Sequence, residues 1–228
     1  MRATLLRVGI DKGNLGVFGP IFEDGSFEYI PIPECSLSKE DRAYKHIIGR
    51  SGKPLSIYLP ERCKNIKVHY DPEFETFTYG DPTRRRKSLS EMKRDDILVF
   101  YAGLTPYKNK SYREGLYIIG YFTVEDVIDF NELSEEEIRK YCKLYPNNAH
   151  MKRIDGTENL VLVVGQKGKD KSKLLSKAIL IGGKDGRVTR EMEGQLGISG
   201  SILRSIPKMI GKEKYLNNLK RILRRFDP

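Results

Sequence analysis

The chain has 228 residues, with 41 Lys and Arg against 31 Asp and Glu, a formal net charge of +10 and no Trp. It contains no apolar run of about 18 residues or more, which excludes a membrane-spanning helix, and its first residues lack the small-residue cleavage site of a signal peptide. Its three widely spaced cysteines form no C-x-x-C pair, which argues against a disulfide framework or a cysteine-bound zinc and favours a cytoplasmic protein.

The positive charge is concentrated at one end of the sequence. Residues 1–150 hold 23 Lys and Arg and 23 Asp and Glu, whereas residues 151–228 hold 18 and 8. This basic C-terminal region favours a polyanionic partner, with nucleic acid the first candidate. A solvated basic surface is the alternative, because abundant Lys and Glu with only two Gln are typical of proteins from heat-loving organisms.

Strand-like segments dominate the first part of the chain. The segment "ATLLRVGI" (3–10) is typical of a buried strand, and "IFEDGSFEYIPIPE" (21–34) predicts a hairpin that turns at Asp24-Gly25. The segments "DILVFYAGL" (96–104) and "GLYIIGYFTV" (115–124) predict a second and a third core strand, joined by a polar connection.

The second part of the chain adds helices and further strands. Ser134 and Glu137 predict a capping box that starts a helix leading into "IRKYCKLY". The segments "NLVLVVG" (159–165) and "KAILIGG" (177–183) predict two more strands. The segment "EKYLNNLKRILRRF" predicts an amphipathic helix. Its apolar stripe comprises Tyr215, Leu216, Leu219, Ile222, Leu223 and Phe226.

These elements together indicate the fold class. Short strands outnumber helices, which predicts an α+β fold with a mostly antiparallel, barrel-like sheet and a few flanking helices. Neither an internal repeat nor a low-complexity linker divides the sequence, so we expect a single domain over residues 1–228.

Acidic, aromatic and basic residues gather in "YDPEFETFTYGDPTRRRKSL" (70–89). A site that binds a nucleic acid base needs a ring for stacking, an acceptor for the base edge and cations for the phosphates. Within this segment we expect Asp71, Tyr79 and Asp81 to contact the base. The cations expected on the phosphates are Arg84, Arg85, Arg86 and Lys87. The alternative is a surface loop with one aromatic anchor and a solvated arginine run.

Three further segments carry candidate site residues. Asp11 and Lys12 in "GIDKG" directly follow a strand, where side chains meet a cleft, although these residues taken alone favour an Asx-type turn with an exposed Lys. Tyr101 ends a strand just before Ala102-Gly103, and we expect it to face a pocket. In "GQLGISGSILRSIPKMIGK" the candidates for phosphate contacts are Arg204, Lys208 and Lys212, unless the segment is simply a loop leading into the last helix.

The three histidines, His46, His69 and His150, form no H-x-x-H or H-E-x-x-H pattern. The sequence therefore offers no ligands for the zinc chemistry of metalloproteases or deaminases, and we expect no metal and no cofactor. Packed or surface positions are the usual role of such isolated histidines.

The ordered set "RVGIDKG…FEDGSFEYIPIPE", "DPEFETFTYGDP" and "DILVFYAGL…GLYIIGYF" resembles the nucleotide modification associated domain, third class, of prokaryotic and phage genomes. The resemblance covers most of the chain and implies a domain that handles modified nucleic acid bases, with DNA ahead of RNA as the partner. The segment "RDDILVFYAGL…GLYIIGYFTVEDV" is more loosely similar to the strand-turn-strand core of PUA-like domains, such as the EVE, ASCH and YTH readers. It implies a small β-barrel with a nucleotide in an aromatic-lined pocket.

Three functions remain open from the sequence. The first is a nucleic-acid-binding domain of a base-modification system that recognises a base in an aromatic and acidic cleft. The second is an enzyme that modifies a base or nucleotide, with Asp11 or Asp81 as general base and Lys12 or an arginine holding an anionic cosubstrate. The third is a thermophilic scaffold protein whose basic region binds an acidic partner.

Overall fold

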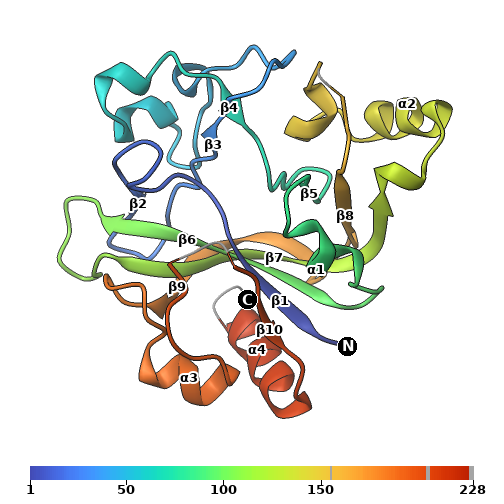
Figure 1. Cartoon of the computed structure of the whole chain (residues 1–228). Helices are drawn as coiled ribbons and strands as arrows, with labels where there is room; N and C mark the ends of the chain where they lie inside the picture. Colours follow the sequence, from blue (N-terminus) through green and yellow to red (C-terminus); the bar gives the residue numbers. More distant parts are fainter. Residues whose placement is uncertain (155, 204–205, 226–228) are drawn as a thin grey trace.

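The computed structural model describes the whole chain except residues 155, 204–205 and 226–228. Its framework is an eight-stranded sheet, accompanied by a separate two-stranded sheet (Figure 1). The strands are β1 (Ala3–Arg7), β2 (Gly19–Ile21), β3 (Ile32–Pro33), β4 (Val68–His69), β5 (Thr78–Asp81), β6 (Ile97–Pro106), β7 (Gly115–Asp129), β8 (Val161–Gly165), β9 (Ser172–Gly182) and β10 (Lys208–Ile210).

The α-helices are fewer than the strands in the described residues. None of them combines the length and the apolar composition that crossing a bilayer requires. The α-helices are α1 (Arg86–Ser90), α2 (Glu135–Leu144), α3 (Arg190–Leu196) and α4 (Glu213–Arg225). The 3-10 turns are η1 (Tyr44–His46), η2 (Leu55–Tyr58), η3 (Glu61–Cys63), η4 (Phe130–Glu132) and η5 (Ala149–Lys152).

The large sheet is mostly antiparallel, which confirms the predicted fold class. Its main path runs β10-β1-β6-β7-β8-β5, while β2 pairs with β6 and β9 pairs with β7. Only the β1–β6 and β2–β6 pairs are parallel among these strands. Within the described residues no pairing joins β5 to β10, so the sheet does not close, and the barrel-like, PUA-like part of the expectation is not confirmed.

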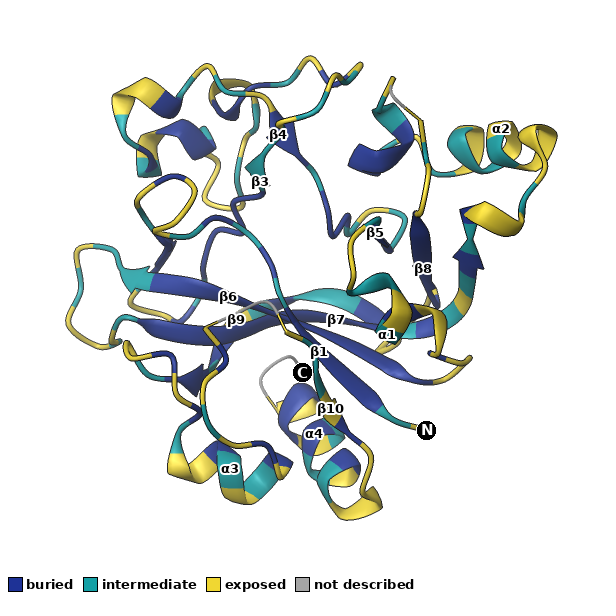
Figure 2. Cartoon of the chain, viewed as in Figure 1, coloured by how far each residue is buried: buried dark blue, intermediate teal, exposed yellow. Residues whose placement is uncertain are grey.

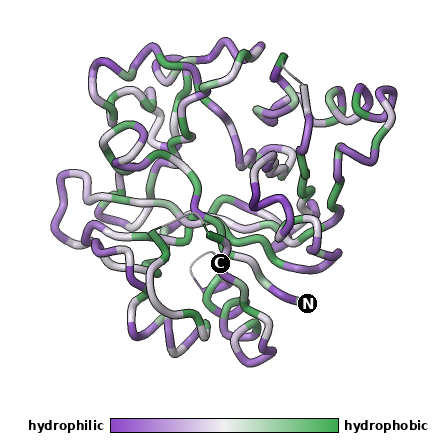
Figure 3. Tube along the Cα trace, viewed as in Figure 1, coloured by the Kyte–Doolittle hydropathy of each residue, from purple (hydrophilic) through white to green (hydrophobic). Residues whose placement is uncertain are grey.

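Apolar residues cover both faces of the central strands. Side chains alternate along β6, so Phe100 joins the cluster on one face and Tyr101 the cluster on the other. The helices α3 and α4 cover the Tyr101 face (Figure 1). Figure 3 shows hydrophobic residues concentrated along these strands, and Figure 2 shows the same strands buried.

The two helices predicted with the clearest signals are present. Ser134 Oγ accepts from the Glu137 amide at 3.3 Å, and the Glu137 carboxylate accepts from the Ser134 amide at 2.8 Å, which is the predicted capping box of α2. The predicted stripe of α4 packs into the core through Leu216, Leu219, Ile222 and Leu223. Phe226, the last residue of the predicted stripe, lies outside the described residues.

The long segment between β2 and β5 forms its own layer beside the large sheet, with its own apolar cluster. Glu40 fastens this layer to η5. Its carboxylate is almost fully buried and accepts from Arg42 Nε at 2.9 Å and from Lys152 Nζ at 2.7 Å. Burial alone would raise the pKa of the Glu40 carboxyl, but the hydrogen bonds from Arg42 and Lys152 outweigh it and lower the pKa from 4.5 to about 2.

We expect Glu40→Gln to reduce the free energy of unfolding by about 3 kcal/mol at pH 7. The ionised Glu40 stabilises the fold fully above pH 4.5 and loses this effect as the pH falls towards 2. Wild type and variant should therefore converge in urea titrations only as the pH falls to about 2, while the exposed control Glu135→Gln stays close to wild type throughout. A constant difference across this pH range would contradict the assignment.

Candidate functional site

A cavity of about 370 Å³ opens where the carboxyl end of β1, the β4–β5 segment and η5 meet. Such a volume is within the range of small-ligand pockets. Several residues predicted from the sequence as site residues line this cavity. Two histidines and two arginines that were not predicted as site residues line it as well: His69, His150, Arg7 and Arg153. The predicted residues that line it are Asp11, Asp71, Tyr79, Asp81 and Arg85.

Asp71 lies at the buried end of this cavity and is held by its neighbours. Its Oδ1 accepts from the Gly80 amide at 3.0 Å and from Asn148 Nδ2 at 2.8 Å. The peptide bond to Pro72 is cis. The hydrogen bonds from Gly80 and Asn148 fix the carboxylate between β5 and η5, with Oδ2 directed to the ring of His150.

Asp81 organises the next turn of the chain. Its Oδ2 accepts from the Tyr79 hydroxyl at 3.2 Å and pairs with Arg85 Nε at 2.8 Å, while Oδ1 accepts from the Thr83 amide at 2.7 Å. Tyr79 is only 4% exposed and packs on Phe100, so its ring offers no free face for stacking. Burial raises the pKa of Tyr79 well above 10, and the hydroxyl remains a neutral donor.

Asp11 forms the Asx-type turn that was the structural alternative for "GIDKG". Its Oδ1 accepts from the amides of Gly13 at 2.7 Å and Asn14 at 3.0 Å. Its Oδ2 pairs with Arg7 at 3.3 Å on the wall of the cavity. Lys12 does not line the cavity; its ammonium is exposed and pairs with Glu114 at 2.7 Å.

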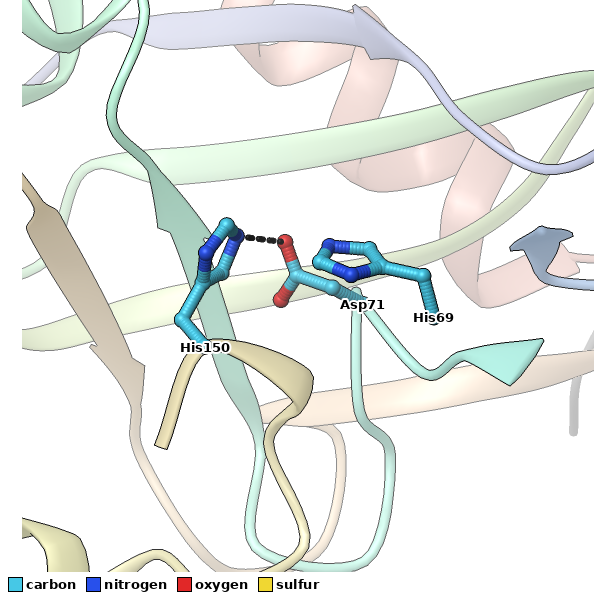
Figure 4. A group of neighbouring side chains, drawn as sticks. All are labelled: His69, Asp71 and His150. Atoms are coloured by element: carbon cyan, nitrogen blue, oxygen red, sulfur yellow. Dashed lines mark ion pairs between the residues drawn. The ribbon is translucent and has the colours of Figure 1, made fainter. Parts of the chain in front are cut away.

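Two histidines complete the buried end of the cavity, and Figure 4 shows their rings on either side of the Asp71 carboxylate. His150 Nε2 lies 3.5 Å from Asp71 Oδ2, and the two rings meet edge to face with centroids 4.7 Å apart. His69 Nδ1 bonds the buried carboxylate of Glu34 at 2.7 Å. Burial would raise the pKa of Glu34, but His69 and Arg153 outweigh it and lower the pKa to about 2, so Glu34 is ionised at neutral pH.

Three arginines face the same cavity from different elements. They are Arg7 on β1, Arg85 before α1 and Arg153 after η5, with side chains 11%, 29% and 21% exposed. Each pairs with one carboxylate, and Arg153 Nε is buried without a hydrogen-bond partner in the described part of the chain. The cavity therefore contains cationic groups that its own acids do not fully satisfy.

Tyr101 is a correction to the sequence interpretation. It is completely buried on the face covered by α3 and α4, and its hydroxyl donates to the carbonyl of Ile202 at 2.9 Å. Tyr101 does not end its strand either, because β6 continues to Pro106, and side-chain alternation turns Tyr101 away from the cavity and directs Phe100 towards Tyr79.

The remaining predicted phosphate contacts are spread over the surface. Arg84 and Lys87 are exposed and Arg86 is half-buried beside them, but none of these three lines the cavity. Lys208 lies on β10 opposite Leu5, and Lys212 is exposed just before α4. Arg204 lies outside the described residues.

The sequence interpretation missed His69, His150, Arg7, Arg153 and Glu34. Only one of these carried a usable signal, because His69 and Asp71 stand two residues apart in "HYD" and can converge from one extended segment. His150 lies on η5, and no local sequence pattern indicates that η5 packs beside the β4–β5 segment.

A larger cavity of about 920 Å³ lies at the hairpin between β6 and β7, beside β9 and α3. It is lined by Lys110, Tyr112 and Lys177 among others, and by none of the predicted site residues. It contains neither of the buried histidines, so the smaller cavity is the stronger candidate for chemistry.

Comparison with known proteins supports the family indicated by the sequence motifs. The family model described as nucleotide modification associated domain 3 matches residues 2–196. No curated protein and no solved structure matches the chain. The matched range includes every described residue that lines the candidate cavity. The chain belongs to the nucleotide modification associated domain 3 family.

Proposed function

We propose that this cavity binds a single nucleotide unit, free or within a nucleic acid strand, as part of a base-modification system. The family membership gives the biological theme. The observation that carries the proposal is the convergence of three partly buried arginines on one cavity. Guanidinium groups form strong, charge-assisted hydrogen bonds with phosphate oxygens, above all where water is partly excluded.

Arg85 is the best placed of the three for a phosphate. Its Nε is committed to Asp81, and its two terminal nitrogens make no hydrogen bond within the described residues. The Asp81 pair fixes the direction of the guanidinium, so little side-chain entropy is lost when a ligand binds. Arg153, which lines the same cavity, offers a second guanidinium group for the phosphate.

In this proposal the base is recognised through hydrogen bonds to its polar edge and not through stacking on an aromatic ring. The aromatic wall expected from the sequence is missing, because Tyr79 and Tyr101 are both buried. Asp11 remains as an acceptor, since its side chain is 29% exposed. Its carboxylate can accept hydrogens from an exocyclic amine, as required for reading a base edge.

An enzyme that modifies the bound nucleotide is the second candidate, and the buried end of the cavity favours it. Carboxylate–imidazole pairs are the usual composition of general acid–base sites, and here two of them, His150–Asp71 and His69–Glu34, lie side by side. Asp71 with His150 is better placed for this role than Asp11 or Asp81, whose oxygens are occupied by backbone amides and arginines.

We expect Arg85→Ala to weaken binding of a short single-stranded DNA by about 10- to 100-fold, since a hydrogen bond to a charged group is worth about 1.5–3 kcal/mol. Fluorescence anisotropy at two salt concentrations measures this, with matched RNA and duplex DNA in parallel. Arg139→Ala is the matched control, because Arg139 also pairs with a carboxylate four residues earlier but lies exposed on α2.

Equal effects of the two substitutions would contradict the cavity as the binding site, and so would the absence of binding to every nucleic acid and mononucleotide tested. Mass spectrometry of the nucleosides recovered from the same samples distinguishes the two candidates. Unchanged masses with every added cosubstrate favour a binding module, whereas a new mass identifies an enzyme.

A further inference from the structure

The buried end of the cavity gathers three potential metal ligands from two parts of the chain. His69, Asp71 and His150 are 5%, 7% and 5% exposed, and their donor atoms all lie within 4.8 Å of one another. Figure 4 shows the carboxylate beside the two imidazoles. Groups as polar as these are buried together only when they satisfy one another or share a ligand.

Hydrogen bonds outside the cluster determine which atoms are available. The carboxylate of Glu34 lies 2.7 Å from His69 Nδ1, so Nε2 is the ring nitrogen that is left for a ligand. Within the described residues no hydrogen bond is made by His69 Nε2. Metal-binding histidines almost always have such a carboxylate or carbonyl partner on the second ring nitrogen.

The carboxylate of the cluster is oriented in the same way. Asp71 Oδ1 accepts from Asn148 and Gly80, whereas Oδ2 has only a longer contact of 3.2 Å with the Gly80 amide and the 3.5 Å contact with His150. One oxygen therefore holds the side chain in place and the other faces the imidazoles.

The separation of the ligand atoms suits a bound ion. Metal–nitrogen and metal–oxygen bonds of about 2.0–2.2 Å in tetrahedral geometry place neighbouring ligand atoms about 3.4 Å apart. The observed distance from His150 Nε2 to Asp71 Oδ2 is 3.5 Å. A metal therefore needs only a small approach of the remaining ligand, His69, to complete one face of its coordination shell.

We propose that His69 Nε2, His150 Nε2 and an oxygen of Asp71 bind a divalent transition metal ion, with its remaining positions open to the cavity. Two imidazoles and one carboxylate suit Zn²⁺ or Fe²⁺, whereas Mg²⁺ and Ca²⁺ prefer shells made of oxygen alone. Nothing in this inference depends on nucleotide binding. It adds to the cavity an ion that would face any phosphate or water bound there.

Zinc binding to the full chain tests the site directly. After removal of metals with a chelator, calorimetric titration with Zn²⁺ should show about one tight site per chain, and Co²⁺ should give the visible absorption bands of a nitrogen and oxygen site. Mg²⁺ at the same concentrations should produce no comparable heat. Failure of the folded wild-type chain to bind Zn²⁺ or Co²⁺ would overturn the proposal.

Histidine variants assign the ligands. His69→Gln and His150→Gln should each weaken zinc binding by about 100-fold or more, and Glu34→Gln by about 10- to 100-fold through its effect on His69. The chain supplies a matched control in its only other histidine, His46, which is exposed on η1, and His46→Gln should bind zinc like wild type.

Circular dichroism and melting of each variant separate loss of ligand from loss of fold. A folded His69→Gln or His150→Gln that keeps the wild-type affinity would show that zinc binds elsewhere, for instance at the exposed Cys35, and would refute this site. A loss of affinity in His46→Gln equal to that in His150→Gln would refute it as well.

Discussion

Replacing Gly80 by Ala is expected to displace His150 and to destabilise the fold. A Cβ at this position would lie 2.5 Å from His150 Cδ2 and 3.0 Å from a methyl group of Leu160, distances that packed atoms cannot keep. Overpacking of this kind costs about 1–3 kcal/mol, which lowers the melting temperature of a chain of this size by roughly 2–12 °C. If His150 binds a metal, zinc affinity should fall together with the melting temperature.

Gly194→Ala is the matched control for this substitution. Gly194 lies exposed in α3 with nothing within 4 Å of the added Cβ, so Ala should raise helix stability by up to about 1 kcal/mol. Scanning calorimetry and zinc titration of both variants give the two measurements. A Gly80→Ala chain with wild-type stability would show that β5 and η5 do not pack as described, and unchanged zinc affinity in a destabilised chain would argue against His150 as a ligand.

The fold could be predicted from the sequence wherever the residues of an element themselves form a recognisable local pattern. The long apolar runs at β6 and β7, the Ser134–Glu137 capping box and the stripe of α4 each depend on neighbouring residues, and each is present. Closure of the sheet depends instead on which distant edges pair, and no local pattern encodes that choice. The barrel-like arrangement was for this reason the least secure part of the prediction.

The crowded segment 70–89 shows why the site was only partly predictable. Its carboxylates look like ligands for an external molecule, yet much of their capacity serves the chain itself. Asp71 accepts from the Gly80 amide, Glu73 from the Thr76 amide and Asp81 from the Thr83 amide. These turns place Asp71, Asp81 and Arg85 around the cavity, so the three residues lie together as expected, although much of their hydrogen bonding serves the fold.

Residues that enter the site from elsewhere were beyond sequence reasoning. His150 comes from η5, Arg153 directly follows η5, and Arg7 comes from the end of β1. Conversely, Tyr101 was placed in the pocket because it was expected to end a strand, but β6 continues to Pro106, and the sequence does not tell which face of a buried strand a residue occupies. Both errors concern tertiary placement and leave the chemistry of the residue types unaffected.

The second large effect is expected in α4, which lies beyond residues 2–196 matched by the family model. Leu219 is fully buried against the sheet, and Leu219→Ala should lower the free energy of unfolding by about 2–5 kcal/mol. Urea titration measures the loss. Asn217→Ala is the control, because Asn217 is exposed on the same helix and should change stability by less than about 0.5 kcal/mol.

Leu219→Ala also separates the stability of the sheet from the chemistry of the cavity. The helix α4 covers the face of the sheet that holds Tyr101, whereas Tyr79 and the residues of the β4–β5 segment lie beyond the opposite face. At temperatures where the variant remains folded, its affinities for zinc and for DNA should therefore match those of wild type. If they fall with stability, the two faces are energetically coupled, and α4 is part of the functional unit although the family pattern ends before it.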